Sequence, residues 1–521
     1  MRTVRSYVQD RWHAATDGFV SLLDPCSEAP IARVSSEGVD FGAALGHARE
    51  RGAASLRAMT IGQRAELLGA MAGTLHEARE ELIAISLENT GTTRRDSKFD
   101  IDGATFVLSH YAELGREIGD RACFVDGEGI RLGRSARFWG QHVWLPLEGA
   151  AVLINAFNFP VWGFAEKAAC ALLAGVPVIV KPATSSALVT ERCVEKIVEA
   201  DILPLGALSL ICGVTGDLLS RLGGQDVLAF TGSASTAEQL RGLPNLLRGG
   251  TRVNIEADSL NAAVLGPDVE PGEETWELFI REVAKEITQK TGQKCTAVRR
   301  IFVPATRIHA AEEALVERFS DVVAGNPQDP SVTMGPLATA RQLQDAVAGI
   351  ARLCREARRV HGSGEPIDGV GCPDGKGYFI GPTLLRADDG NNSTVVHEHE
   401  VFAPVSTLMP YDGSGREAGR LVARGGGCLV TSAYSDDPEF LGEFIATGGA
   451  WAGRLYLGSK KAAGQLPGSG AALPQVLHGG PGRAGGGSEL GGERGLQLYL
   501  QRVGVTGDRA LVDRLAGLRE R

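Results

Sequence analysis

Hydrophobic residues in the first hundred positions recur at intervals of three and four, a spacing typical of helices. The pattern is clearest over residues 41–52 and 61–87. Thr60 is the expected N-cap of the second helix, because Gln63 follows three residues later as in a capping box. The Asn-Thr-Gly sequence at residues 89–91 is expected to end that helix. We therefore predict that the first hundred residues are mostly helical.

From Trp144 onward, short apolar runs alternate with helical stretches. The expected strands are residues 150–154, 176–180, 208–212 and 227–230, and the expected helices are residues 161–173, 185–199, 217–222 and 234–241. This alternation predicts a parallel sheet with helices on both faces. Ligands of such sheets bind at the carboxyl ends of the strands, so residues that directly follow a strand are candidates for a site.

A second α/β region follows the first. The expected strands are residues 253–256, 262–265 and 300–303, and the expected helices are residues 274–288 and 310–323. Farther along, six of the nine residues 479–487 are glycine. Such a run is typical of flexible linkers, but an apolar pattern resumes over residues 488–499. We expect the glycine-rich stretch to be an ordered loop that packs against the second α/β region.

Composition narrows the possible partners. The chain has 521 residues and a net charge of −10, which argues against nucleic acid or an anionic membrane as a partner. No apolar leader follows the N-terminus, and the longest uncharged apolar run, residues 149–165, is too short to span a membrane. Nine cysteines without a CxxC pair argue against structural zinc and for a reduced, cytoplasmic protein. We expect no bound metal.

Three polar residues are candidates for catalysis. Cys295 lies near Lys290 and Lys294, whose positive charge would favour a thiolate, although most cysteines near a lysine are structural. Glu256 ends a buried strand, where poor solvation would raise its pKa towards that of a general base, although an N-cap or an ion pair is the commoner role. Asn158 follows another strand and could donate to an oxyanion, although a turn asparagine is more common.

Two further strand ends could bind an anionic group. Lys181 directly follows the strand at residues 176–180, where a cation suits a phosphate or a ribose. The sequence Thr231-Gly232-Ser233 opens a helix, so its backbone N–H groups could hold a phosphate. Neither feature matches a GxGxxG or Walker A loop, so each is weak by itself.

Taken together in chain order, these residues resemble the aldehyde dehydrogenase superfamily over nearly the whole chain. The matching motifs are FNFP (157–160), KPA (181–183), FTGS (230–233), Glu256, GQKC (292–295), ExFxP (400–404) and SELGG (488–492). The resemblance implies an α/β protein with a Rossmann-like parallel-sheet cofactor domain, an α/β catalytic domain and a small β oligomerisation segment.

The resemblance also implies domain boundaries. Residues 1–125 and 148–257 would bind NAD(P), and residues 258–482 would form the catalytic domain. Residues 126–147 and 483–521 would form the oligomerisation segment, in which residues 496–500 would be a strand donated to a partner's sheet. A homodimer or a dimer of dimers follows from this arrangement.

Roles for individual residues are carried over in the same way. Cys295 would attack the aldehyde, Asn158 and the Cys295 N–H would hold the oxyanion, and Glu256 would activate water. The expected cofactor-binding residues are Lys181, Thr184, Phe230, Thr231, Gly232, Ser233, Glu400 and Phe402. Position 184 is Thr where NAD-preferring members often have Glu, so NADP is the expected cofactor and NAD the alternative.

A narrower resemblance points to a branch that oxidises coenzyme-A-linked semialdehydes in bacterial aromatic degradation. The segments that carry it are residues 34–38, 100–103, 154–160, 256–261, 294–297 and 478–492. The phenylacetate-pathway member of this branch carries an extra C-terminal hydratase domain, for which this chain has no room. The expected substrate is therefore the benzoate-pathway compound, 3,4-dehydroadipyl-CoA semialdehyde.

Three alternatives remain open at this point. The chain could act in the phenylacetate pathway, could pass its acyl group to coenzyme A, or could be a binding protein with a dead site. Glu256 argues against acyl transfer to coenzyme A, because enzymes of that type usually lack this base. Two departures from the superfamily pattern concern the site itself: Ala257-Asp258-Ser259 replaces Leu-Gly-Gly, and Ala403 replaces Gly.

Overall fold

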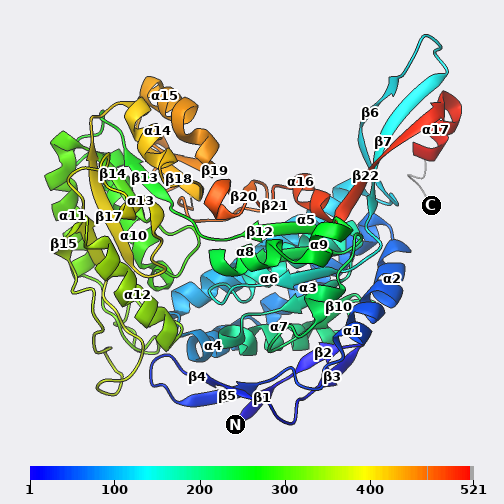
Figure 1. Cartoon of the computed structure of the whole chain (residues 1–521), viewed down its shortest axis with the longest axis horizontal. Coiled ribbons are helices and arrows are strands. Elements are labelled where there is room, and N and C mark those ends of the chain that lie inside the picture. Colours follow the sequence, from blue (N-terminus) through cyan, green and yellow to red (C-terminus); the bar gives the residue numbers. More distant parts are fainter. Residues whose placement is uncertain (466, 517–521) are drawn as a thin grey trace.

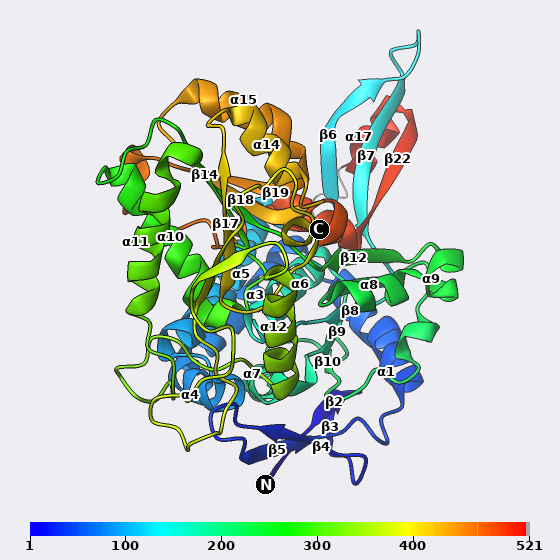
Figure 2. The same cartoon turned by 60° about the vertical axis from the view of Figure 1, so that its left-hand side comes forward.

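Two seven-stranded sheets and a projecting three-stranded sheet organise the molecule. The structure is a computed structural model that describes residues 1–465 and 467–516. In Figures 1 and 2 the first large sheet lies low in the molecule, the second lies beside and above it, and the small sheet extends outward as an arm.

The first sheet contains the strands expected from the alternating pattern. In sheet order its strands are β12 (Arg252–Glu256), β11 (Val227–Thr231), β8 (Ala151–Ile154), β9 (Val178–Lys181), β10 (Leu208–Leu210), β2 (Ser6–Val8) and β3 (Arg11–His13). The first five run parallel, which confirms the prediction. The last two are antiparallel additions at one edge.

The prediction that the chain begins with helices was wrong for the first 40 residues. Besides β2 and β3, a separate small sheet is formed by β1 (Arg2–Val4), β5 (Pro30–Val34) and β4 (Val20–Leu23). The strands of the first 40 residues are only three to five residues long, and in β1 and β3 the exposed position is an arginine. Their alternation is therefore too short to stand out as a strand pattern.

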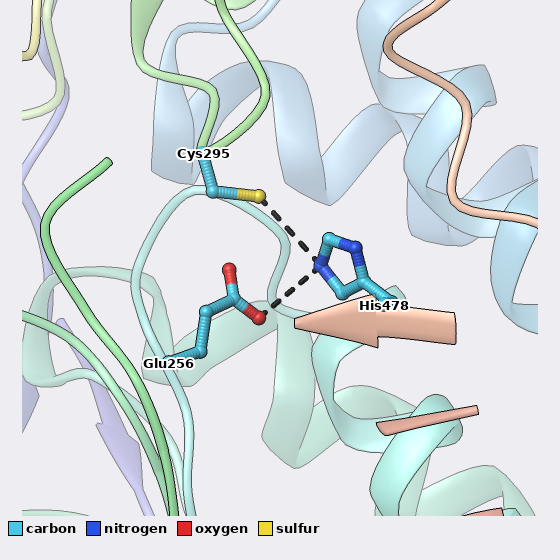
Figure 3. A group of neighbouring side chains, drawn as sticks. All are labelled: Glu256, Cys295 and His478. Carbon is cyan, nitrogen blue, oxygen red and sulfur yellow. Dashed lines mark hydrogen bonds and ion pairs between the residues drawn. The ribbon is translucent and has the colours of Figure 1, made fainter. Parts of the chain in front are cut away.

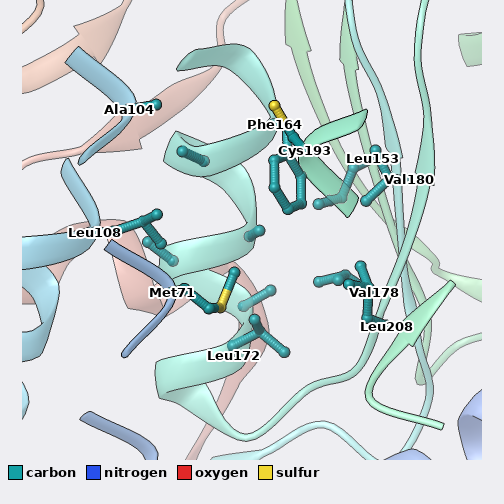
Figure 4. Close-up of a cluster of buried hydrophobic side chains, with 14 of the residues drawn as sticks. Met71, Ala104, Leu108, Leu153, Phe164, Leu172, Val178, Val180, Cys193 and Leu208 are labelled. Atoms are coloured by element: carbon teal, nitrogen blue, oxygen red, sulfur yellow. The ribbon is translucent and has the colours of Figure 1, made fainter. Parts of the chain in front are cut away.

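Helices cover both faces of the first sheet, as predicted. On one face α6 (Trp162–Ala174) lies between the sheet and helices α3 (Ile61–Glu77) and α5 (Arg94–Ile118), with α7 (Ala187–Glu199) alongside. Figure 4 shows Phe164 and Leu172 of α6 among sheet residues such as Val178. Nearly every side chain of α6 is buried, because a helix that is apolar on all sides must lie inside the molecule. The other face packs against α1 (Phe41–His47), α8 (Ala234–Arg241) and α9 (Pro244–Gly249).

The sequence predicted where these helices begin more accurately than where they are interrupted. Thr60 and Gln63 form the expected capping box at the start of α3. The predicted helix 61–87 is two helices, because Ala78 leaves helical geometry between α3 and α4 (Arg79–Thr90). The predicted helix 41–52 continues from α1 through a π-helical turn, η1 (Ala48–Gly52), into α2 (Ala53–Arg57).

The second sheet is also mainly parallel. In sheet order its strands are β15 (Arg358–His361), β16 (Thr383–Arg386), β17 (Val405–Tyr411), β14 (Arg300–Pro304), β13 (Ala262–Leu265), β18 (Cys428–Tyr434) and β19 (Ala452–Gly458). Only β15 is antiparallel. The longer helices around it are α10 (Glu274–Thr288), α11 (Ile308–Ser320), α12 (Ala340–Leu353), α14 (Gly415–Ala423) and α15 (Pro438–Gly448).

The glycine-rich stretch is ordered, as expected, and it contacts both large sheets. It lies between two short antiparallel strands, β20 (Leu477–Gly479) and β21 (Ser488–Leu490). The Arg483 N–H donates to the Gly426 carbonyl over 3.0 Å, just before β18. The Ala257 N–H donates to the Ala484 carbonyl over 3.1 Å, just after β12. The stretch therefore joins the end of the first sheet to the second.

The arm is a three-stranded antiparallel sheet of β22 (Leu500–Asp508), β7 (Phe138–Pro146) and β6 (Phe124–Arg131). The prediction of a strand at residues 496–500 was wrong for all but Leu500, the first residue of β22, and its donation to a partner stays a prediction. Residues 493–499 form short helical turns, α16 (Glu493–Leu496) and η9 (Gln497–Tyr499), and β22 pairs with β7 of the same chain. Leu496, Tyr499 and Leu500 are all buried, a spacing that suits a helical turn better than a strand.

The described chain ends in α17 (Arg509–Ala516), which packs on the arm, and the predicted oligomerisation segment runs on into residues 517–521, outside the described residues. Among the helices of the described residues, none has the length and apolar character needed to cross a membrane.

Candidate active site

The three predicted catalytic residues line one pocket. Asn158, Glu256 and Cys295 border a cavity of about 40 Å³ between the ends of the first sheet and the second α/β region. Thr231 and His478 line it as well, and Phe99, Phe159 and Trp162 form an apolar wall. The pocket thus combines a thiol, a carboxylate and an amide beside an apolar surface that suits a carbon chain.

The loop that carries Cys295 has an unusual backbone. It leaves α10 through η4 (Gln289–Gly292), where Lys290, Thr291 and Gly292 have φ of 52°, 57° and 66°. Such values are costly for residues other than glycine and are held only when the surroundings determine them. A Cβ on Gly292 would lie 2.3 Å from the Ala403 carbonyl carbon, so only glycine fits this close approach.

The buried side chain of Asn261 holds the same loop by hydrogen bonds. The Asn261 side-chain amide donates to the Cys295 carbonyl over 2.8 Å and to the Ala297 carbonyl over 2.9 Å. Its carbonyl oxygen accepts from the Ser259 hydroxyl over 2.7 Å. Asn261 is fully buried. The position of Cys295 is therefore set by hydrogen bonds that are costly to break, because each would leave a buried group unpaired.

Of the two lysines expected to favour a Cys295 thiolate, Lys290 acts on the thiol through its charge, whereas Lys294 is engaged with another partner. The Lys294 ammonium pairs with Glu286 at 2.5 Å, and the Lys290 ammonium lies 4.3 Å from the centre of the Phe159 ring. Desolvation and then the Glu256 charge raise the pKa of Cys295, whereas the hydrogen bond and charge of His478 lower it. The charge of Lys290 acts on Cys295 as well as on Asp96 and Asp100, and the Lys294 ammonium serves Glu286.

A histidine that the sequence analysis did not assign lies between the thiol and the carboxylate (Figure 3). The Nε2 atom of His478 is 3.2 Å from Glu256 Oε2 and 4.0 Å from Cys295 Sγ. The other carboxylate oxygen, Glu256 Oε1, is buried without a hydrogen-bond partner in the described part of the chain. His478 thus binds one carboxylate oxygen, and the other can accept a hydrogen bond from a bound molecule such as water.

The pKa of Glu256 is shifted in the direction opposite to the prediction. Burial alone would raise it, as expected, but the charge and hydrogen bond of His478, together with the Lys167 charge and a Cys295 hydrogen bond, lower the pKa of Glu256 below its ordinary value. Conversely, burial opposes a charged His478, but the Glu256 carboxylate outweighs it and raises the pKa of the imidazole. The sequence could not reveal this, because His478 lies more than 180 positions away on a short, glycine-flanked strand. Its only signal was its place at the head of the HGG motif.

Behind this pair lies a second group of buried charges. The Lys167 ammonium is 3.0 Å from Glu166 and 3.2 Å from Glu489, and the Asn254 amide donates to Glu489 over 2.8 Å. Burial raises the pKa of Glu489 to about 7. Among the described residues, two sets have ligand atoms close enough for a metal: Glu256 with Cys295 and His478, and Glu166 with Glu256 and Glu489. Both sets are engaged with each other or with Lys167, and we assign neither to a metal.

The predicted cofactor residues of the first sheet lie side by side at its carboxyl edge. Strand register places Lys181 beside Ile154, Phe230 beside Ile154, and Thr231 beside Glu256. The Lys181 ammonium takes part in none of the ion pairs of the described residues, and burial lowers its pKa. The Thr231 hydroxyl is buried without a partner in that part of the chain. Polar groups left unpaired at a strand edge fit a bound nucleotide.

The remaining residues of this edge lie on the turns that follow the strands. Gly232 follows β11, and Ser233 caps α8, where its hydroxyl accepts the Thr236 N–H over 3.3 Å. Thr184 begins η2 (Thr184–Ser186), shortly after β9. These positions suit the diphosphate and the adenosine ribose of a dinucleotide.

Glu400 and Phe402 approach the pocket from the second α/β region. Glu400 accepts the Ser259 N–H over 3.2 Å, and burial raises its pKa to about 8 although Arg299 lies 3.5 Å away. The Arg299 guanidinium lies 5.3 Å from the centre of the Phe402 ring and donates to the Gly292 and Ala403 carbonyls, each over 2.9 Å. Arg299 therefore ties the nucleophile loop to the Glu400–Phe402 segment.

The departures from the superfamily pattern are accommodated. Ala403 is fully buried, and its carbonyl is one of the acceptors of Arg299. Asp258 forms an ion pair with Arg483 of the glycine-rich stretch. Ser259 bonds to Asn261 and accepts the Leu429 N–H over 3.0 Å. The residues that replace Leu-Gly-Gly thus fasten the end of β12 to its surroundings.

Comparison with known sequences gives a match over nearly the whole chain. A sequence model described as the aldehyde dehydrogenase family matches residues 12–502. A protein named 3,4-dehydroadipyl-CoA semialdehyde dehydrogenase, from Aromatoleum evansii, is 43% identical over 91% of this chain and 92% of its own length. Alpha-ketoglutaric semialdehyde dehydrogenase from Bacillus subtilis is 28% identical over 68% of this chain and 69% of its own.

Solved structures share the fold. A betaine aldehyde dehydrogenase point mutant from Staphylococcus aureus, in complex with NAD+, superposes with a TM-score of 0.84 and 23% identity, covering 98% of each chain. Lactaldehyde dehydrogenase from Escherichia coli gives a TM-score of 0.83 and 22% identity, covering 97% of this chain and 99% of its own. At this level of identity the likeness concerns the fold alone.

Proposed function

The chain belongs to the aldehyde dehydrogenase family and is an NAD(P)-dependent aldehyde dehydrogenase, and from this premise we propose that it oxidises 3,4-dehydroadipyl-CoA semialdehyde to the carboxylic acid with NADP. The observation that carries the proposal is the pocket in which Cys295, Glu256 and Asn158 meet. The 43% identity to a relative of that name supports the choice of substrate.

In the first half of the reaction, Cys295 sulfur forms a bond to the aldehyde carbon. The carbonyl oxygen becomes an oxyanion that the Asn158 amide and the Cys295 N–H hold by hydrogen bonds. When bound, the nicotinamide of the cofactor supplies the hydride acceptor. Loss of the hydride from the tetrahedral carbon leaves a thioester on Cys295.

In the second half, Glu256 takes a proton from a water molecule that attacks the thioester. The buried Oε1 atom of Glu256 has no partner in the described residues and is the atom available to that water. The carbon–sulfur bond then breaks, and the acid leaves. A buried carboxylate in the thiol's own pocket favours hydrolysis over transfer of the acyl group to coenzyme A.

For the cofactor, Lys181, Thr184 and Ser233 would hold the adenosine ribose and its phosphates. Phe230, Thr231 and Gly232 would shape the edge of the sheet beneath it. Lys181 is the cation at this edge, and Thr184 carries no charge that would repel a 2′-phosphate, which supports NADP over NAD.

Glu400 and Phe402 would position the nicotinamide ribose and ring. Because the pKa of Glu400 is raised to about 8, its carboxyl keeps a proton at neutral pH. It can then both donate to and accept from ribose hydroxyls.

We extend the proposal to assembly and location. The arm of β6, β7 and β22 projects from the body and exposes Ile130, Phe138 and Leu145, and α17, packed on the arm, exposes Leu511. These apolar side chains support its use as the contact of a homodimer or a dimer of dimers. Sedimentation at micromolar concentration would detect such a dimer, and a monomer alone would exclude it. Six of the nine cysteines are buried, in keeping with a reduced, cytoplasmic protein.

A kinetic comparison tests the substrate and the cofactor together. The purified protein is given free medium-chain aldehydes or coenzyme-A-linked semialdehydes, each with NAD and with NADP. We expect the highest kcat/KM for the coenzyme-A-linked compound with NADP, and formation of the acid whether or not free coenzyme A is present. An acyl-CoA product that appears only with free coenzyme A would contradict hydrolysis.

A further inference from the structure

A buried thiol beside a carboxylate is a poor nucleophile unless a positive charge offsets both effects. Cys295 lies in a desolvated pocket with Glu256 as its neighbour, and both conditions disfavour a thiolate. Of the lysines nearest in sequence, Lys294 pairs with Glu286, and Lys290 lies over the Phe159 ring and acts on Cys295 through its charge without a hydrogen bond. A cation that also hydrogen-bonds to the sulfur must therefore come from another part of the chain.

His478 is placed to supply it. Its strand, β20, is fixed by pairing with β21, in which His478 lies directly opposite Glu489. The side chain is 5% exposed and its Nε2 atom faces both Cys295 Sγ and Glu256 Oε2, at 4.0 and 3.2 Å. A single N–H can therefore serve a thiolate and a carboxylate, and Figure 3 shows the ring beside the two side chains, with one nitrogen facing both.

We propose that His478, as an imidazolium, is the residue that holds Cys295 in the reactive thiolate form and keeps Glu256 in place for the second half of the reaction. The proposal deepens the proposed function, because it assigns a partner to the same nucleophile and base.

Formation of the thiolate moves one proton within the pocket. The Cys295 S–H bond breaks, and its proton passes to the neighbouring Glu256 carboxylate. The sulfur keeps the electron pair, and the His478 N–H stabilises it. Once the sulfur is bound in the thioester, its negative charge is gone, and the imidazolium again favours ionised Glu256. The carboxyl then releases its proton to solvent and can accept one from the attacking water.

Other charges face this group from the elements packed around it. Glu489 lies opposite on β21, and Glu166 and Lys167 approach from α6. Lys167 offsets only one of the two carboxylates, so that the group keeps a net negative charge while both are ionised, and this charge favours an imidazolium at His478. Glu256 on β12 and Cys295 on the nucleophile loop also face His478. The cations that act on Cys295 through their charge are Lys290, Arg299 and Arg454.

Alkylation of Cys295 tests the proposal without aldehyde or cofactor. The rate of modification by iodoacetamide is measured between pH 5 and 10, with Cys295 identified by mass spectrometry. In the unaltered protein we expect a midpoint at or below that of an ordinary thiol, about 8.5. A midpoint above 10 would overturn the proposal even if every variant failed to fold.

His478→Gln keeps a hydrogen-bond donor and removes the charge. We expect its alkylation rate at pH 7 to fall at least about tenfold, because a shift of one pKa unit changes the thiolate fraction tenfold. His361→Gln, at the far edge strand β15 of the second sheet, is the matched control and should keep the original profile. An unchanged profile in folded His478→Gln would assign His478 a merely structural role.

The outcome is separable from that of the proposed function. If His478 controls alkylation but the protein oxidises no aldehyde, the proposed function fails and the inference stands. If the protein oxidises aldehydes and the alkylation profile does not depend on His478, the inference fails and the proposed function stands. The pH dependence of kcat/KM is a second measurement. In His478→Gln the acidic limb of that profile should shift to higher pH, in addition to any decrease in the maximal kcat/KM.

Discussion

The two large sheets contribute to the active site in different ways. The first sheet supplies residues that directly follow its strands: Asn158 after β8, Lys181 at the end of β9 and Glu256 at the end of β12. The second α/β region supplies residues from loops: Cys295 after η4, and Glu400 and Phe402 before β17. His478 comes from a short strand that joins the two regions.

The difference lies in what holds the side chains. At the first sheet, the regular register of parallel strands places Lys181 and Glu256, so their positions follow from backbone pairing, and Asn158 lies on the turn after β8. In the loops, buried polar side chains such as Asn261 and Arg299 take over that task. We therefore expect substitutions near the strand-end residues to lower activity less than substitutions near the nucleophile loop.

The largest expected effect is loss of the nucleophile. Cys295→Ala should reduce aldehyde oxidation by at least about 10⁴-fold, because no other group can form the covalent intermediate. Cys354→Ala, at another partly exposed cysteine, is the control and should keep full activity. Initial rates of cofactor reduction measure both. Substantial oxidation by Cys295→Ala would remove the loop from the mechanism.

Next comes the oxyanion donor at the strand end of the first sheet. Asn158→Ala should lower kcat about 10²–10³-fold and leave stability nearly unchanged, as expected for one lost donor to the oxyanion. Asn245→Ala is the control, because it removes an amide that donates to the Leu219 and Leu222 carbonyls. It should lower the free energy of unfolding and leave kcat nearly unchanged. A drop in kcat below tenfold for Asn158→Ala would show that the backbone N–H suffices.

A change on the nucleophile loop should affect stability and activity together. The control is Gly250→Ala, outside the nucleophile loop, where φ is 61° and a Cβ would meet open space. It should cost about 1–2 kcal/mol in free energy of unfolding from backbone strain alone. Gly292→Ala, at φ 66°, adds a clash with the Ala403 backbone and should cost about 1–3 kcal/mol more. It should also lower kcat, because it displaces Cys295. Urea unfolding and kcat give the comparison, and equal losses in the two variants would refute the tight loop.

The smallest expected effect concerns the cofactor edge of the first sheet. Thr184→Glu should reverse the preference for NADP, with a change of about tenfold or more in the ratio of the two kcat/KM values, because a carboxylate repels a 2′-phosphate and can bind ribose hydroxyls. The aldehyde is the same in both assays, so the ratio is its own control. An unchanged ratio would place the 2′-phosphate away from Thr184.

These contrasts also explain what could be predicted from the sequence. The parallel strands of the first sheet and the helices between them follow from apolar runs and turns, and their strand-end residues were found in the same way. The short N-terminal strands were missed, because three to five residues give too weak an alternation. Residues 496–499, which lie in helical turns, were taken for a strand for a related reason, since a brief apolar run does not reveal its period.

Electrostatics inside the pocket was the least predictable part. The lysines adjacent to Cys295 suggested an activated thiol, and the end of β12 suggested a raised pKa for Glu256. Both inferences used only near neighbours in sequence or burial. The pairing of β20 with β21 brings His478 to the pocket from far along the chain, and it is His478 that reverses the expected shift of Glu256.

The division of labour between Cys295 and Glu256 is tested most directly by rapid mixing of the Glu256→Gln variant with aldehyde and NADP. Acylation needs a thiolate. Without the carboxylate that keeps it charged in the unaltered protein, His478 can be neutral and take the Cys295 proton itself, which gives the same imidazolium–thiolate pair. Deacylation needs the missing base. We expect a rapid burst of about one reduced cofactor per site, an acyl group found on Cys295 by mass spectrometry, and steady turnover lowered about 10²–10⁴-fold. Full steady-state turnover, or no burst from a folded variant, would contradict the account.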